Sequence, residues 1–449
     1  MGGVREVPHT PETAEALAVQ GKIMVEFFKG SESLKNQFND SDPLKRLETA
    51  DPLNDITRHR RSPAHAPPEP MMPMHRAVAE RHALMRRTVA AVALSALAAF
   101  PATSASAQST PSGLTRLLES ALARMPARTG VYVKHLTTGE EAAVKADEAF
   151  SSASVIKLTI LVRAFQLVDQ GKITLTDRVQ IGRAELRDGS GVLQYHDLGQ
   201  TPTIKDLLTE MVITSDNVAT DLMLTRVGGV DSLNAWLKSS GFPHLSMVAR
   251  GHVYRRKILA LVNPAFDTLT AEETTGLQYA QQGDALFELY ASLFTGARAT
   301  WVDMVRDPAN KKILADGRSR LPVQDHAYWL GDMNPRETGR LLEAIERGTM
   351  TSAASAAMMR TMLRRQQAGA RRLPHFLDVP VAHKTGDSPV IANDVGMIYA
   401  RSGTIIIAFF VNGVAGSLGE TEDMVGRVAQ QIVDYFDGPA APARRSPAP

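Results

Sequence analysis

The spacing of apolar residues predicts strands near both ends of the folded chain and helices between them. Residues 130–136 form a β-rich run, and residues 394–399 and 404–411 form two more that a hairpin signal joins. Apolar residues recur at helical spacing in residues 114–127, 154–170, 204–211, 218–224 and 425–436. We therefore expect an α/β (α+β) fold in which an antiparallel sheet forms from both chain ends, with flanking helices and an inserted all-helical lobe.

Residues 85–107 have the three-part pattern of a secretory signal peptide. A basic start is followed by an apolar run at 89–100 and then by small residues that a signal peptidase cuts. The run is shorter than the ~20 residues that a membrane-spanning helix needs. We expect a mature protein that begins at Gln108, is periplasmic or secreted, and has no membrane attachment after cleavage.

The segments outside this pattern lack the features of a folded domain. Residues 1–84 are rich in proline and charge and show no sustained apolar period, so we interpret them as a mis-assigned start or a disordered extension. Residues 438–449 (GPAAPARRSPAP) are expected to form a disordered tail. We therefore expect one folded domain, at residues 108–437.

Composition narrows the functional classes. The chain has 449 residues, 44% of them hydrophobic, which is enough for a full core and excludes a wholly disordered protein. The net charge of +2 gives no strong field for nucleic acid, and the absence of cysteine excludes disulfides, thiolate metal sites and a cysteine nucleophile. The seven histidines after residue 107 show no metal-binding spacing. We expect a monomer with no metal and no cofactor.

Three short motifs carry the candidate chemistry. They are an S-x-x-K at Ser154 and Lys157, an S-D-N that starts at Ser215, and a K-T-G that starts at Lys384. Each motif alone is weak, because a lone S-x-x-K is an ordinary helix start and a lone S-D-N is most often a helix cap. Their order and their local contexts, a helix start, a helix–loop junction and a strand, make the combination informative.

The residue types fit nucleophilic catalysis. Ser154 and Lys157 are three apart on a helix, so we expect both side chains on one face, and a serine needs a neighbouring base. Lysine acts as that base only if its pKa falls, and Lys384 is a cation that would lower it and attract a substrate carboxylate. Ser215 is then a candidate for passing a proton to the leaving nitrogen. The side chain of Asn217 is a candidate for holding an acyl-side amide of the substrate. The backbone N–H groups of Ser154 and Asp387 are candidates for the oxyanion hole.

Together the motifs resemble the class A serine β-lactamases and related serine hydrolases, a group that includes the penicillin-binding proteins. The resemblance covers most of residues 114–436. It implies a β-lactamase-like fold, catalytic roles for the residues just named, and substrate binding that extends to Thr385 and Gly386. It also implies that Tyr195, ahead of the S-D-N motif, forms an aromatic wall of the site.

The chain departs from that family between residues 249 and 333, which form a long insert. There the family has its omega loop, with an Arg-x-Glu-x-x-Leu-Asn pattern whose glutamate activates the deacylating water, and this pattern is missing. The first glutamates in the insert are Glu272 and Glu273. They are candidates for the deacylation base only if the loop is re-routed, and a solvated helix start is the alternative interpretation.

A second departure is Asp387, where the family usually has a small neutral residue. If it points inward, its carboxylate would repel the carboxylate of a β-lactam. We therefore expect a metal-free serine hydrolase that opens β-lactams through an acyl-enzyme on Ser154, with a role in β-lactam breakdown and antibiotic resistance, and with slow release of ordinary penicillins. The alternatives are a D-alanyl-D-alanine peptidase or esterase, which would act on a peptidoglycan-like substrate, and a penicillin-binding or sensor protein.

Overall fold

A computed structural model of the chain describes residues 112–438. The predicted extension at 1–84, the signal peptide at 85–107 and all but the first residue of the tail at 438–449 lie outside these residues. These domain limits therefore stay predictions.

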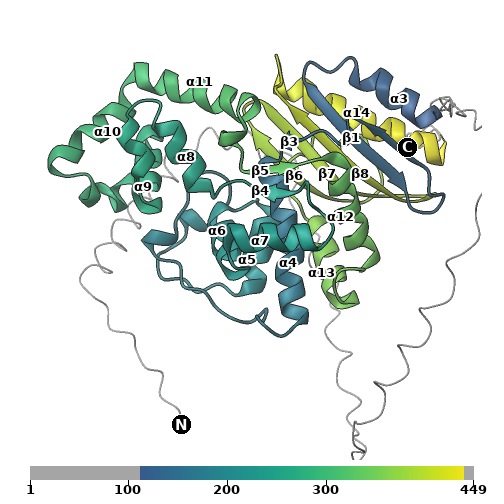
Figure 1. Ribbon diagram of the computed structural model, residues 1–449, viewed down its shortest axis with the longest axis horizontal. Coiled ribbons are helices and arrows are strands. Elements are labelled where there is room, and N and C mark those ends of the chain that lie inside the picture. The colour runs from purple at the N-terminus through teal and green to yellow at the C-terminus, as the bar shows by residue number, and fades with distance from the viewer. Residues whose placement is uncertain (1–111, 439–449) are drawn as a thin grey trace, which may run out of the picture. The chain divides into compact units, whose positions relative to one another are not determined.

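The centre of the fold is a five-stranded antiparallel sheet with the order β2-β1-β8-β7-β6 (Figure 1). Strands β1 (Arg128–His135) and β2 (Glu141–Val144) come from the N-terminal part of the described chain. Strands β6 (Val381–Ser388), β7 (Ile391–Ala400) and β8 (Gly403–Asn412) come from the C-terminal part. Pairing of β1 with β8 runs from Arg128↔Asn412 to His135↔Ile405, so the sheet closes from both chain ends as predicted.

Both faces of the sheet are buried. Side chains alternate along each strand with period two, so one strand contributes to the core on each face. On β8, Ile405, Ile407, Phe409 and Val411 enter one core, and Ile406, Ala408 and Phe410 enter the other. Helices α3 (Gly113–Leu122) and α14 (Leu418–Asp437) cover the first face. The second face packs against the helical part of the molecule, in which each fully buried aliphatic side chain contributes roughly 1.5–3 kcal/mol.

The helices of the second layer pack around α4, whose first residue is the lysine of the S-x-x-K motif. Nine of its thirteen residues are buried, which fits a central helix. The helices in this layer are α4 (Lys157–Asp169), α5 (Ile204–Ile213), α6 (Asn217–Arg226), α7 (Gly229–Ser239), α12 (Pro335–Arg347) and α13 (Ala353–Leu363). No helix within residues 112–438 is long and apolar enough to cross a membrane.

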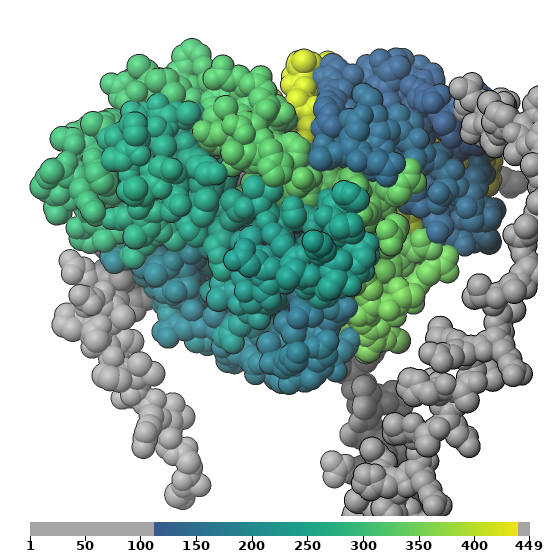
Figure 2. Space-filling model, in the orientation of Figure 1, coloured from purple at the N-terminus to yellow at the C-terminus, as the bar shows by residue number. Residues whose placement is uncertain are grey.

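The insert at 249–333 is helical except at its end. Its α-helices are α8 (Gly251–Leu259), α9 (Ala271–Gln282), α10 (Ala299–Arg306) and α11 (Pro308–Gln324). Its last residues form strand β5 (Gly331–Met333), which pairs with β3 (Phe150–Ser151) and β4 (Ser246–Met247), so the prediction of an all-helical lobe is wrong there. Phe266, Tyr279 and Leu314 of the insert belong to the same core as α4, and the insert surface adjoins residues 170–250 (Figure 2).

Candidate active site

Ser154 lies in a 3₁₀ turn, Ala153–Ile156, that leads into α4. The sequence predicted an α-helix from 154, but the first turn is tighter. Ala153 has a φ of 44°, a left-handed backbone that costs a non-glycine residue energy and that clusters at functional sites. Strand β6 passes close to this turn, because a Cβ on Gly386 would collide with the carbonyl oxygen of Ser152. Gly386 thus lets β6 approach the nucleophile.

Lys157 is buried at the base of the site. Its Nζ donates to Ser215 O at 2.5 Å, to Ser215 Oγ at 3.1 Å and to Asn217 Oδ1 at 3.0 Å. Burial, followed by the charge of Lys384, holds the pKa of Lys157 well below its ordinary value. No hydrogen bond in the described chain joins Lys157 to Ser154 Oγ, although both side chains line one cavity.

Lys384 approaches the same hydroxyl from β6. Its Nζ lies 3.0 Å from Ser215 Oγ and donates to Thr385 O at 3.0 Å. The side chain is fully buried, and burial lowers its pKa from 10.5 to about 8 against the opposing charges of Asp387 and Asp394. Ser215 Oγ therefore bridges two amines whose charged forms are both disfavoured, a geometry suited to proton transfer.

The S-D-N motif holds this arrangement in place. Ser215 has a φ of 58°, and Asp216 caps α6 by accepting from Ala219 N at 2.9 Å. The other Asp216 oxygen accepts from Leu193 N at 2.9 Å, which ties the preceding loop to the motif. Asn217 Nδ2 donates to Asp188 O at 2.8 Å, so the Asn217 amide has a fixed orientation.

A cavity of about 290 Å³ opens over these groups. Of the predicted site residues, Ser154, Lys157, Asn217 and Asp387 line it. Ser215 and Lys384 lie behind this surface and are joined to it through Lys157. Thr385 and Gly386 do not line the cavity. Thr385 is fully buried, and its Oγ1 has no hydrogen-bond partner within residues 112–438.

The structure does not place Tyr195 at the cavity, contrary to what the resemblance implied. Tyr195 ends a 3₁₀ turn, Leu193–Tyr195, and packs half-buried against the helical core. The loop before it turns at Gly191, where a Cβ would collide with Asp216, and the residues of this loop that line the cavity are Arg187, Asp188 and Ser190. The predicted aromatic wall is therefore absent from the residues that line this cavity.

Glu272 and Glu273 are also not at the cavity. Both lie in the first turn of α9, where Glu273 forms a capping box with Thr270 and pairs with Arg298. Glu272 pairs with Arg183. The expectation that either glutamate serves as a re-routed base is not supported, because the helix start and these arginines already hold both carboxylates.

The carboxylate of Asp387 does line the cavity, but a buried arginine neutralises it. Arg372, whose side chain is 3% exposed, pairs with Asp387 and also with Glu422 at 2.6 Å. Arg372 Nη1 donates to Asn393 O at 2.9 Å. Burial acts to lower the pKa of Arg372, but Asp387 and Asp394 outweigh burial and raise it. The repulsion that we expected between Asp387 and an anionic substrate is thereby reduced.

A charged wall on the insert side of the cavity was not predicted from the sequence. It contains His252, Arg255 and Arg318 from the insert, together with Arg187, Asp188 and Asp221. Asp221 is four residues after Asn217 on α6, so helical spacing from the S-D-N motif was a signal for it. The wall residues from the insert had no motif that marked them.

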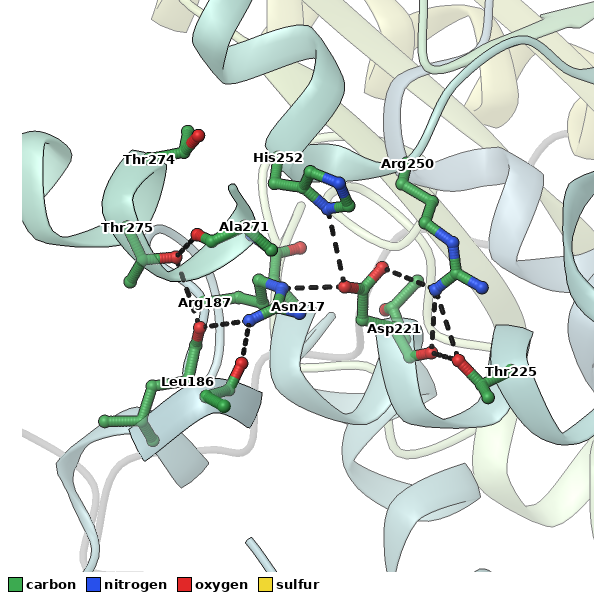
Figure 3. Close-up of polar contacts among 12 residues, drawn as sticks. Leu186, Arg187, Asn217, Asp221, Thr225, Arg250, His252, Ala271, Thr274 and Thr275 are labelled. Atoms are coloured by element: carbon green, nitrogen blue, oxygen red, sulfur yellow. Dashed lines mark hydrogen bonds and ion pairs between the residues drawn. The ribbon is translucent and has the colours of Figure 1, made fainter. Parts of the chain in front are cut away.

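Asp221 is the centre of this wall (Figure 3). Its Oδ2 accepts from Arg187 Nε at 2.6 Å and lies 3.8 Å from His252 Nδ1, and its Oδ1 lies 3.4 Å from Arg250 Nη1. Burial acts to raise the pKa of Asp221, but the His252, Arg187 and Arg250 interactions outweigh burial and lower it to about 2. Within residues 112–438 no group of three or more ligating side chains is arranged to hold a metal ion.

The chain is similar to known β-lactamases in sequence and in fold. The chain is 28% identical to β-lactamase VEB-1 of Pseudomonas aeruginosa over 138 residues, which cover 30% of this chain and 46% of that protein. It is 23% identical to the extended-spectrum β-lactamase PER-1 of Pseudomonas aeruginosa over 72% of this chain and 87% of that protein. A crystal structure of a β-lactamase from Sphaerobacter thermophilus has the same fold, with a TM-score of 0.52 and 21% identity over 72% of this chain and 96% of that one.

The family model described as the β-lactamase enzyme family matches residues 113–286 and 309–436. These segments make up more than half of the chain and contain all three motifs. The residues between them, 287–308, lie within the insert. The chain therefore belongs to the β-lactamase enzyme family.

Proposed function

We propose that this protein hydrolyses the cyclic amide of β-lactams through an acyl-enzyme on Ser154. The observation that carries the proposal is the buried chain Lys157–Ser215–Lys384 beside Ser154, with the Ser215 hydroxyl 3.1 Å and 3.0 Å from the two amines. Because burial favours the neutral amine, Lys157 is suited to take the proton of Ser154 as its oxygen attacks the carbonyl. Ser215 then passes a proton to the departing ring nitrogen, and Lys384 attracts the substrate carboxylate.

A D-alanyl-D-alanine peptidase or an esterase that acts on a peptidoglycan-like substrate is the second candidate. It is favoured by the pairing of Glu272 and Glu273 with arginines, since an enzyme of that kind does not depend on the glutamate that the family uses for deacylation. A penicillin-binding or sensor protein that keeps its acyl group is the third candidate, and the same observation applies to it.

Time-resolved intact-protein mass spectrometry after mixing with benzylpenicillin separates these candidates. We expect a covalent adduct that forms and then disappears as the β-lactam is hydrolysed. An adduct that persists for hours would favour the binding protein or sensor. No adduct, together with ester or D-alanyl peptide hydrolysis, would overturn the proposal in favour of the second candidate.

We further infer that the protein is exported and acts as a monomer on small molecules, without a cofactor, in β-lactam breakdown and resistance. The pattern at 85–107 supports export, with cleavage after Ala107. N-terminal sequencing of periplasmic or secreted material tests this, and we expect Gln108 as the first residue. Exported protein that retains residues from before Met74 would contradict it.

A further inference from the structure

The proposed acyl-enzyme requires a base that activates water, and the cavity limits the choice. Besides Lys157, the proton acceptors on its lining are His252 and the carboxylates of Asp188, Asp221 and Asp387. Each carboxylate faces a guanidinium: Asp188 faces Arg255 at 3.3 Å, Asp221 faces Arg187 and Arg250, and Asp387 faces Arg372. A carboxylate in such an ion pair is a weak base.

His252 differs from these carboxylates. It lies in the first turn of α8, its side chain is 17% exposed, and its ring faces Asp221 (Figure 3). The Nδ1 atom is buried, lies 3.8 Å from Asp221 Oδ2 and forms no hydrogen bond within residues 112–438. No hydrogen bond in the part of the chain that the structure describes engages Nε2. An imidazole that faces a carboxylate with Nδ1 and has no hydrogen bond at Nε2 can offer the Nε2 lone pair to a water molecule in the cavity, as a general base does.

We propose that His252, oriented by Asp221, is the general base that activates the deacylating water on the Ser154 acyl-enzyme. The proposal rests on the proposed function. His252 would contact the water, whereas Asp221 is a positioning residue that acts through the imidazole. In place of the slow penicillin release that we expected from the sequence, this assignment predicts efficient deacylation by a histidine.

The step balances without another reactant. His252 Nε2 takes a proton from water as the water oxygen bonds to the ester carbonyl carbon, and the carbonyl electron pair moves to its oxygen. The tetrahedral intermediate then re-forms the carbonyl and breaks the bond to Ser154 Oγ. The proton on His252 returns to Ser154 Oγ, so the products are a carboxylic acid and the free enzyme.

Charged groups face His252 from several elements. Asp221 comes from α6, Asp188 and Arg187 from the loop that precedes it, Arg250 and Arg255 from the start of α8 and Arg318 from α11, whereas the neighbours from α9, Thr274 and Thr275, are uncharged. A general base accepts a proton only in its neutral form, so the deacylation rate should fall at acid pH.

The test separates acylation from deacylation in His252→Gln, with His326→Gln as the matched control. His326 also pairs with an aspartate of the insert, Asp332 at 3.2 Å, but it does not line the cavity. Stopped-flow and quenched mass spectrometry with benzylpenicillin and a chromogenic cephalosporin should show acylation within about threefold of wild type. Deacylation should be slower by roughly 10²–10⁴-fold in His252→Gln and unchanged in the control.

Two further measurements exclude a purely structural role. Imidazole added to His252→Ala should restore part of the deacylation rate, and the wild-type rate should fall about tenfold per pH unit on the acid side. Deacylation by His252→Gln at the wild-type rate would overturn the proposal, and so would equal loss of acylation. If the variants do not fold, a wild-type deacylation rate that stays flat down to pH 5 would overturn it. Absence of any adduct in both wild type and His252→Gln would instead refute the acyl-enzyme, and the proposal would fall with it.

Discussion

The two sides of the cavity differ in whether their charged side chains have ion-pair partners. On the nucleophile side, Lys157 and Lys384 are buried without a carboxylate within ion-pair distance in residues 112–438, and their partners are a hydroxyl, carbonyls and an amide oxygen. On the insert side, Asp188 and Asp221 face guanidinium groups. Unpaired burial lowers the pKa of an amine and makes it a base, whereas pairing keeps charges fixed. The comparison separates two buried amines that can exchange protons from the ion-paired carboxylates of the insert side, which keep their charge.

The largest expected effect is on the nucleophile side. Ser154→Ala should remove the covalent adduct and reduce turnover on the order of 10⁴-fold or more, because the members of such a catalytic unit act together. Truncation at this half-buried position should change the free energy of unfolding by only about 1 kcal/mol. Mass spectrometry and thermal unfolding check both statements. An adduct in this variant would show that another residue is the nucleophile.

The second effect concerns Arg372, which neutralises Asp387 at the cavity edge. Arg372→Met should reduce the free energy of unfolding by about 3–5 kcal/mol, because Glu422 and Asp387 lose a buried partner. Asp387→Asn is the control, since Asp387 is 45% exposed and should cost less than about 1 kcal/mol. Urea unfolding measures both. Similar losses in the two variants would contradict the assignment of the buried arginine as the dominant group.

The third effect tests the unpaired amines through pH. The lowered pKa of Lys384 means that the unfolded chain binds the proton more tightly, so the free energy of unfolding should rise as pH increases from about 8 toward 10.5. The gain attributable to this group is about 3 kcal/mol as an order of magnitude. It should disappear from the pH dependence of Lys384→Gln relative to wild type. Parallel pH profiles for the two proteins would show that the amine is not destabilised by burial.

The smallest effect is expected at Glu272 and Glu273. The double variant Glu272→Gln/Glu273→Gln should keep steady-state turnover of a chromogenic cephalosporin within about twofold, because neither carboxylate lines the cavity. The α9 cap should remain, because Thr270 is unchanged and glutamine can replace glutamate in a capping box, so the loss of the ion pairs with Arg183 and Arg298 should cost less than about 1 kcal/mol of stability. A collapse of turnover would instead establish one of these residues as the deacylation base and remove the distinction between the two sides.

The sequence predicted the nucleophile side better than the insert side, for physical reasons. Period-two runs determine β7 and β8, and the three motifs are short segments whose residues are fixed by one helix, one loop and one strand. The contact between Gly386 and Ser152 and the position of His252 depend on segments that are distant in sequence. Tyr195 was misplaced because its loop turns at Gly191, against Asp216, and only the packed structure contains that contact.

The strands at the base of the insert determine how strongly a change in the length of the insert affects stability. Strands β4 and β5 pair directly, with Met247 opposite Gly331, so the segment leaves and re-enters the fold at neighbouring points. The entropy of closing a loop grows only with the logarithm of its length, about 0.6 kcal/mol for each doubling. Added length at exposed positions of the segment therefore changes the stability of the sheet very little, whereas a deletion within residues 287–308 would remove buried core residues such as Tyr290 and Val305. Mutations can therefore change the cavity wall on α8 without moving the nucleophile.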